Sequence, residues 1–312
     1  MEYMEIVKRS FINAWEYKFL WLFGFFVSIT DGFGGWHWWS DKFDRGDWGG
    51  WSEFDDLKYL FRSNDRLEDF FDFHIEPVVV LLVIMGILAL GVVFWALSVL
   101  SEGALVRGIS RKHYNLETGF GDCWSTGLNK FFRLFGITLL AFISVFAVLF
   151  ILIIMNIPFW FVFKPLGIMI TIFSVPLFFA VIVAIICVEG WAIRYGVLYD
   201  KSWLDAISDG ISLFKNNIGK TLGVAFSSFL SQLIIWFMLV ICMLFIAVPF
   251  IILGMYDLWL GLIPGLAVAF LIIVFSSAIF GVFASSVWTL GFIKLTGYSE
   301  EQESSEAELA VS

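Results

Sequence analysis

Charged side chains are scarce in this chain, since only 15% of its 312 residues are Asp, Glu, Lys or Arg. Five stretches of 24 residues or more contain no charged side chain at all: 78–101, 134–163, 165–188, 221–256 and 258–293. An α-helix needs about 20 apolar residues to cross about 30 Å of hydrocarbon, and soluble domains do not accumulate such runs. The shortage of charge therefore excludes a soluble globular protein and predicts an all-α, multi-pass membrane protein.

Cysteine and histidine are also rare, with three residues of each. Cys123, Cys187 and Cys242 are far apart in the sequence, so they predict neither a disulfide framework nor a metal site. The histidines lie outside the five apolar stretches, where no imidazole could act as the base for a serine inside the membrane. We therefore expect no catalytic residue, no metal and no cofactor.

The first apolar stretch is the shortest, because only residues 19–30 separate Lys18 from Asp31. A span at this place must recruit its flanks, with Lys18 snorkelling inward or Asp31 lying among the outer headgroups. With this stretch included, the sequence predicts six transmembrane helices.

The distribution of Lys and Arg predicts the orientation of these helices. Thirteen Lys and Arg lie on the side of the two termini, either before the first span, after the last span or in the loops of that side. Six lie on the opposite side. Five of those six lie in the acidic loop 31–76. By the positive-inside rule, both termini are cytoplasmic. Five of the six prolines then fall at the expected outer ends of helices: Pro77, Pro158, Pro165, Pro249 and Pro264.

An internal repeat organises the chain. Residues 122–136 match residues 205–219 with five identities at a constant offset of 83, and residues 18–24 match 130–136 at an offset of 112. Each copy reads as a cytoplasmic amphipathic helix, a span, an outer turn and a returning span. Because each copy crosses the membrane twice, the copies are expected to be parallel.

These features predict a single six-span membrane domain over residues 1–298. The repeats cover about 5–110, 118–197 and 202–297, and the first contains the outer loop 31–76. Residues 299–312, which contain five Glu and no Lys or Arg, are expected to form an acidic cytoplasmic tail.

Three segments carry a resemblance to a known group: residues 15–24 (WEYKFLWLFG), 102–108 (EGALVRG) and 205–219. They resemble six-span prokaryotic membrane proteins that include the membrane domain of bacterial glycerophosphodiester phosphodiesterases and uncharacterised stand-alone relatives. The resemblance implies the six-span fold and a place in a prokaryotic cell membrane. It assigns phosphodiesterase activity to no residue, because the acidic and histidine residues of a soluble catalytic domain are not present here.

Ionisable side chains recur near the cytoplasmic ends of the returning spans: Glu102, Arg107, Glu189, Arg194 and Lys294. Such groups are costly in a membrane unless they are paired or snorkel to the headgroups. A spacing of five places Glu and Arg of one helix about 140° apart, so they are poorly placed to pair with each other. The hypothesis is an ion pair between repeats, Glu102 with Arg194 or Glu189 with Arg107, and snorkelling is the alternative.

The outer loop combines aromatic and acidic residues. Its candidate contacts to lipid or to a partner are Trp36, Trp38, Trp39, Trp48, Trp51, Phe70 and Phe71. Two interpretations stay open, amphipathic helices on the outer membrane surface and a docking site for another membrane or extracytoplasmic protein. Asp41, Asp44 and Asp47 do not have the spacing of an EF-hand loop.

The string Gly119-Phe120-Gly121-Asp122 matches the GxGD motif of intramembrane aspartyl proteases. That chemistry needs two carboxylates that share a proton at membrane depth, whereas Asp122 lies in a polar connection. Its repeat equivalent, Asp205, begins an amphipathic helix. Both acids are therefore interpreted as stabilising a helix N-terminus.

The sequence favours a non-enzymatic membrane protein, a scaffold or accessory factor that organises lipid or a partner protein. Nucleic acid is not expected as a partner. The alternative is a transporter or channel for an uncharged or lipid-like solute, because hydroxyl groups occur within the spans: Ser144, Ser227, Ser228, Ser231, Ser276, Ser277, Ser285 and Ser286. In membrane helices such serines also mediate helix packing.

Overall fold

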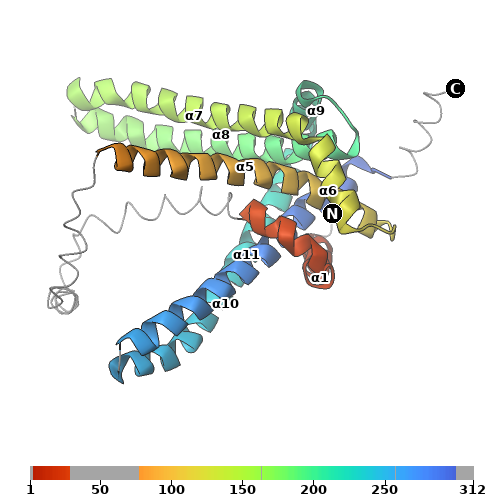
Figure 1. The fold of residues 1–312 in the computed structure, drawn as a ribbon. Coiled ribbons are helices and arrows are strands. Elements are labelled where there is room, and N and C mark those ends of the chain that lie inside the picture. Colours follow the sequence, from red (N-terminus) through yellow and green to blue (C-terminus); the bar gives the residue numbers. More distant parts are fainter. Residues whose placement is uncertain (1–2, 29–76, 163, 257, 300–312) are drawn as a thin grey trace. The chain divides into compact units, whose positions relative to one another are not determined.

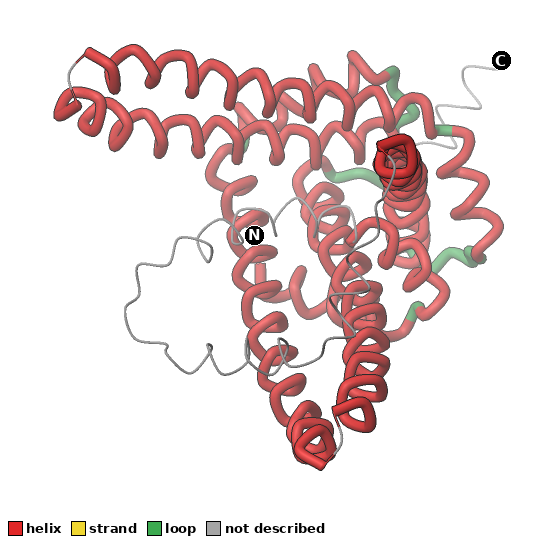
Figure 2. The backbone as a smooth tube through the Cα atoms, turned by 60° about the vertical axis from the view of Figure 1, so that its left-hand side comes forward, coloured by secondary structure: helices red, strands yellow, loops and turns green. Residues whose placement is uncertain are grey.

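Long α-helices make up most of the described chain. The computed structural model describes residues 3–28, 77–162, 164–256 and 258–299 (Figure 1). The long helices are α5 (Pro77–His113), α7 (Phe131–Val162), α8 (Lys164–Leu198), α10 (Ile218–Tyr256) and α11 (Leu258–Thr296). All five are long and apolar enough to cross a membrane. The described residues contain no strand (Figure 2), so the chain is an all-α protein whose helices indicate an integral membrane protein.

Three short helices precede or connect the long ones. They are α1 (Tyr3–Glu16), α6 (Phe120–Asn129) and α9 (Trp203–Asn216). A 3-10 turn, η1 (Lys18–Leu20), follows α1 and continues as an apolar helix to Ser28. At 1.5 Å per residue this helix is about 16 Å long, which is half of a bilayer core. The sixth span therefore stays a prediction, because residues 29–76 lie outside the described residues.

The chain divides into two units, residues 30–96 and the remainder. In the larger unit α7 packs along α8, α10 packs along α11, and the short helices α9 and α1 contact α8 and α11 respectively (Figure 1). The described part of the smaller unit is the first half of α5. Its apolar side chains are exposed, which suits a helix surrounded by lipid.

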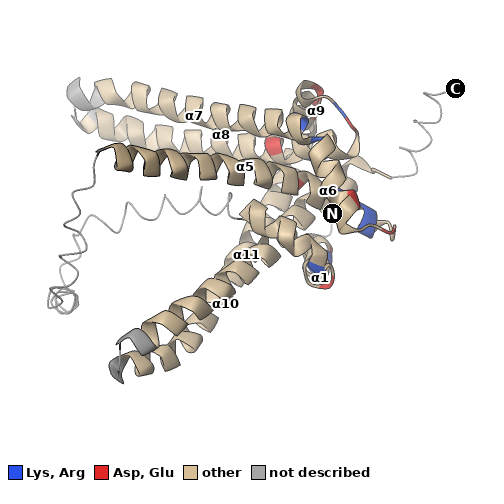
Figure 3. Ribbon diagram, in the orientation of Figure 1, with Lys and Arg blue, Asp and Glu red and all other residues tan. Residues whose placement is uncertain are grey.

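Apart from Lys164 at the start of α8, the charged residues of the long helices in the larger unit lie near one end of each helix. In Figure 3, α7, α8, α10 and α11 carry almost no charged residue along most of their length, and charges gather near α6 and α9. Three prolines lie inside helices and not at their ends, where the sequence predicted them. They are Pro158 in α7, Pro249 in α10 and Pro264 in α11. A helix can continue past proline in a membrane because neighbouring groups satisfy the freed backbone carbonyl.

The apolar helix that ends at Ser28 packs closely against α11. A Cβ atom on Gly24 or Gly281 would overlap the backbone of the other helix, so both positions require glycine. One turn further along, Ser28 Oγ donates to Ser277 O at 2.6 Å. The first apolar segment is therefore held against the last long helix by backbone contact.

Candidate functional site

A buried arginine lies where α5, α8 and α11 meet. The side chain of Arg194 is only 2% exposed. Its Nη1 donates to Glu102 Oε1 at 3.2 Å and to Gly190 O at 2.9 Å, while Nη2 lies 3.5 Å from Ser285 Oγ. A guanidinium removed from water needs an opposite charge and hydrogen-bond acceptors, and three helices supply them here.

Aromatic side chains of α8 and α11 pack against each other about one helical turn from Arg194. Trp191 lies 4.9 Å from Trp288 and 6.0 Å from Phe292, between ring centroids. Gly190 gives the Trp288 ring room, because a Cβ atom there would approach the ring to 3.2 Å. The Trp191 Nε1 donates to Thr221 Oγ1 at 3.3 Å, which adds α10 to the junction. Large rings thus fill the contact between α8 and α11 near Arg194.

Of the five ionisable residues proposed to form ion pairs, Glu102 and Arg194 lie together. Lys294 pairs instead with Glu5 of α1, where the ion pair lowers the pKa of Glu5. The pairing of Glu189 with Arg107 stays a prediction. The seven aromatic residues of the outer loop lie outside the described residues.

Two cations cap the C-terminus of α8. Lys130 Nζ donates to Val197 O at 2.6 Å, and Arg133 Nη1 donates to Gly196 O at 3.1 Å. Both also contact Asp200, whose carboxylate follows the helix end. Partial burial alone would raise the pKa of Asp200, but the hydrogen bonds from Arg133 and Lys130 outweigh it, so the pKa lies below its ordinary value. Cations here complement the negative end of the helix dipole.

The three helices α5, α8 and α11 end alike. Each is followed within two residues by a residue with positive φ, namely Asn115, Asp200 and Gly297, and no other described residue has this conformation. Gly, Asn and Asp tolerate the left-handed region best. A residue in this conformation commonly ends a helix. A tyrosine lies next to each of them, and Tyr298 contacts both Tyr114 and Tyr199 through its ring.

The short helices dock through small residues. Their buried positions are Ile6, Ser10 and Ala14 in α1, Cys123 and Gly127 in α6, and Ala206 and Gly210 in α9, with successive positions four residues apart. All of them except Ile6 are small. The larger apolar residues Trp203 and Ile211 of α9 are exposed. Small residues suit the buried face of a short helix because they allow the helix backbones to approach each other closely.

Bulky apolar side chains are left exposed on these helices and on the adjoining turn of α7. The most exposed are Met4, Phe11, Trp15, Leu128, Phe132 and Leu204. They lie beside exposed charges such as Lys8 and Arg9 of α1. A surface that combines apolar and charged groups in this way fits the interface of a bilayer.

Asp122 lies in the first turn of α6, where Gly119 N donates to its Oδ2 at 3.4 Å. Asp205 has the same place in α9, and its backbone N–H donates to the Ser202 hydroxyl at 3.3 Å. Both acids therefore favour a helix N-terminus, as the sequence analysis proposed for them. Among the described residues, no group of three His, Cys, Asp or Glu could hold a metal ion.

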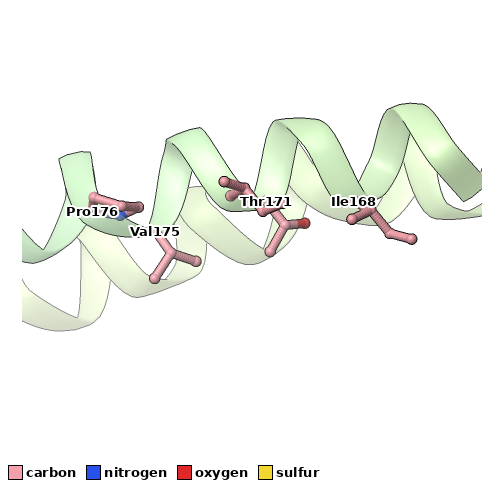
Figure 4. A pocket seen from close by; sticks show the side chains of 5 residues that line it. Ile168, Thr171, Val175 and Pro176 are labelled. Carbon is pink, nitrogen blue, oxygen red and sulfur yellow. The ribbon is translucent and has the colours of Figure 1, made fainter.

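A second polar cluster joins α7 to α8 far from Arg194. Thr171 Oγ1 donates to Asn156 Oδ1 at 3.0 Å, and Asn156 Nδ2 donates to Ser174 Oγ at 3.2 Å. Thr171 also borders a shallow apolar depression with Ile168, Ile172, Val175 and Pro176 (Figure 4). The cluster satisfies its own hydrogen bonds, so we interpret it as a contact between the two helices.

Several of the serines considered as a polar path bond to their own helix. Ser144, Ser227, Ser231 and Ser277 each donate to a backbone carbonyl three or four residues earlier. Such bonds satisfy a hydroxyl within an apolar environment without a second helix or water.

The sequence alone did not single out Gly190, Trp191, Trp288 or the three tyrosines. The regular placement of a tyrosine near the end of each returning helix could have revealed the tyrosines. No known protein family, no curated protein and no solved structure matches the chain.

Proposed function

We propose that this chain is a six-span protein of a prokaryotic cell membrane, built from three parallel helical hairpins with both termini in the cytoplasm. We further propose a non-enzymatic role, that of a scaffold or accessory factor that organises lipid or a partner protein. The partner could bind the outer loop 31–76. The resemblance to six-span membrane proteins agrees with this assignment.

Equivalent contacts support the three repeats. A Cβ atom on Gly127 of α6 would lie 2.5 Å from Leu100 O of α5, and one on Gly210 of α9 would lie 3.0 Å from Val188 O of α8. The short helix that opens one repeat thus docks on the returning helix of the repeat before it. Helix α1 contacts α11 in turn, through the Glu5 and Lys294 ion pair. The opening helix of the first proposed repeat thus contacts the returning helix of the last.

One observation carries the lipid-organising role. The short helices bury small residues against the long helices and leave Met4, Phe11, Trp15, Leu128 and Leu204 exposed. A soluble protein would bury such side chains, whereas an amphipathic helix inserts them among lipid headgroups. Three such helices on one side of the membrane would form a broad surface for lipid contact.

Lipid mass spectrometry of the purified protein tests this role. We expect bound phospholipid to be retained by the protein and lost in part when Phe11 and Trp15 are both replaced by Ser. The matched control is Glu16→Gln, a change of an exposed polar residue on the same helix. Equal lipid retention by all three proteins would contradict the role of these helices.

A transporter for an uncharged or lipid-like solute is the second candidate. The hydroxyl groups of Ser101, Ser286 and Thr289 are fully buried and, within the described part of the chain, have no hydrogen-bond partner. A buried polar group without a partner costs about 1–3 kcal/mol, which water or a solute would relieve. Flux of small polyols into proteoliposomes that falls in Thr289→Val would favour this candidate over the scaffold.

A further inference from the structure

A glutamine lies near the middle of the membrane-spanning part of α10. Gln232 comes twelve residues after Lys220, the last charge before the apolar stretch 221–256. At 1.5 Å per residue this distance is about 18 Å, close to the centre of a hydrocarbon core about 30 Å thick. An amide at this depth is costly unless its hydrogen-bonding groups find partners, since lipid offers none.

The amide of Gln232 is only partly satisfied within the chain. Its Nε2 donates to Ser228 Oγ, one turn earlier on the same helix, at 2.9 Å. Among the described residues this is the one hydrogen bond that the amide makes. A primary amide has two donor hydrogens and an acceptor oxygen, so one hydrogen and the oxygen still need partners.

The surroundings of Gln232 are apolar and open. Phe229, Leu233 and Trp236 lie beside it on α10 and are all exposed. Within the described part of the smaller unit, the helical residues 77–96 contain no side-chain oxygen that could accept from the amide. The missing partner therefore has to bring both a donor and an acceptor into the middle of the membrane.

We propose that the partner is a second copy of this chain, which pairs with the first through Gln232 of α10. A primary amide is complementary to itself, because the free hydrogen of each amide can donate to the oxygen of the other. Two such bonds related by a twofold axis satisfy both glutamines at once, and twofold dimers have this type of self-complementary interface. Hydrogen bonds between side chains in membrane helices drive association in this way.

Cysteine cross-linking in liposomes tests the interface. In a protein with Cys123, Cys187 and Cys242 replaced by Ala, we expect Gln232→Cys to form a cross-linked dimer on oxidation. The matched control is Leu230→Cys, which is also exposed but lies about 160° away around the helix. Equal cross-linking at both positions would overturn the proposal.

The strength of the dimer gives an independent measurement. We expect Gln232→Leu to weaken dimerisation about tenfold in fluorescence energy transfer between labelled copies, which corresponds to about 1.4 kcal/mol. Its unfolding temperature as a monomer should stay unchanged, which separates lost association from misfolding. A monomeric wild-type protein, or reaction of Gln232→Cys with a membrane-impermeant maleimide, would overturn the proposal, and the second result would indicate a water-filled path instead.

Discussion

Arg194 is the one charged side chain that is buried among the described residues. It contacts residues of three long helices, and its carboxylate partner Glu102 is 25% exposed. A buried charge contributes little net stability by itself, because desolvation offsets the attraction. Its effect is on specificity, since any arrangement that separates Arg194 from Glu102 leaves a cation in an apolar environment.

Removal of the carboxylate should therefore destabilise the protein strongly. We expect Glu102→Gln to lower the free energy of unfolding by about 3 kcal/mol, near the lower limit for breaking a buried pair, because Glu102 keeps some contact with solvent. Thermal unfolding in detergent micelles measures the effect. The double variant with Arg194→Gln should recover most of the loss, since neither charge then remains.

The control for this prediction is Glu5→Gln. Glu5 pairs with Lys294, and both side chains are partly exposed, so water can replace the lost partner. A loss of stability in Glu5→Gln as large as that in Glu102→Gln would show that burial of Arg194 is not the cause.

Asp200 predicts a pH dependence. Its pKa is lowered in the folded protein, so the ionised carboxylate stabilises the fold. This contribution is complete above the ordinary pKa of 3.8 and is lost as the pH falls through the lowered value. We expect Asp200→Asn, which tolerates the positive φ, to be slightly less stable at neutral pH, and the difference from wild type to vanish below pH 3.8. A difference that grows on acidification would contradict the assigned direction.

At the scale of the elements, the short helices dock closely where they have glycine, which lacks a side chain. Gly127 and Gly210 bring α6 and α9 into contact with the backbone of a long helix. A side chain at Gly127 would overlap that backbone, and one at Gly210 would crowd it. Gly121 lies on α6 as well, but a Cβ atom there would meet nothing within 4 Å. The two kinds of glycine allow a matched experiment.

We expect Gly127→Ala and Gly210→Ala each to lower the free energy of unfolding by about 1–3 kcal/mol, because the added methyl group forces the helices apart. Gly121→Ala should have no destabilising effect, since alanine favours a helix over glycine. Chemical unfolding in mixed micelles measures all three variants. Equal effects of the three changes would exclude close helix docking as the cause.

At the scale of the whole molecule, the five long helices could be predicted because a helix surrounded by lipid must be apolar along its length. A stretch without charge, such as 221–256, must lie in the membrane whatever it packs against. Helix contacts were harder to predict, because they depend on the rotation of one helix against another. For α9, the sequence predicted an amphipathic helix but did not show that Ala206 and Gly210 would be its buried residues.

The candidate site was predictable in part. The idea that ionisable groups near the helix ends must pair across repeats placed Glu102 beside Arg194, and the two side chains lie together. The contacts of Arg194 with Ser285 and Gly190 O could not be foreseen, because they require the relative heights of α8 and α11. Similarly, a single charge at Lys294 does not reveal that Glu5, almost 300 residues earlier, is its partner.

The central claim is that three hairpins enter the membrane from the same side, so the chain between α1 and α5 must cross it. Labelling with a membrane-impermeant maleimide, in a protein without native cysteines, tests this claim most directly. Trp48→Cys should react in intact cells, and Met4→Cys should react only after permeabilisation. Reaction of both cysteines from the same side of the membrane would leave five crossings and contradict the three-hairpin arrangement.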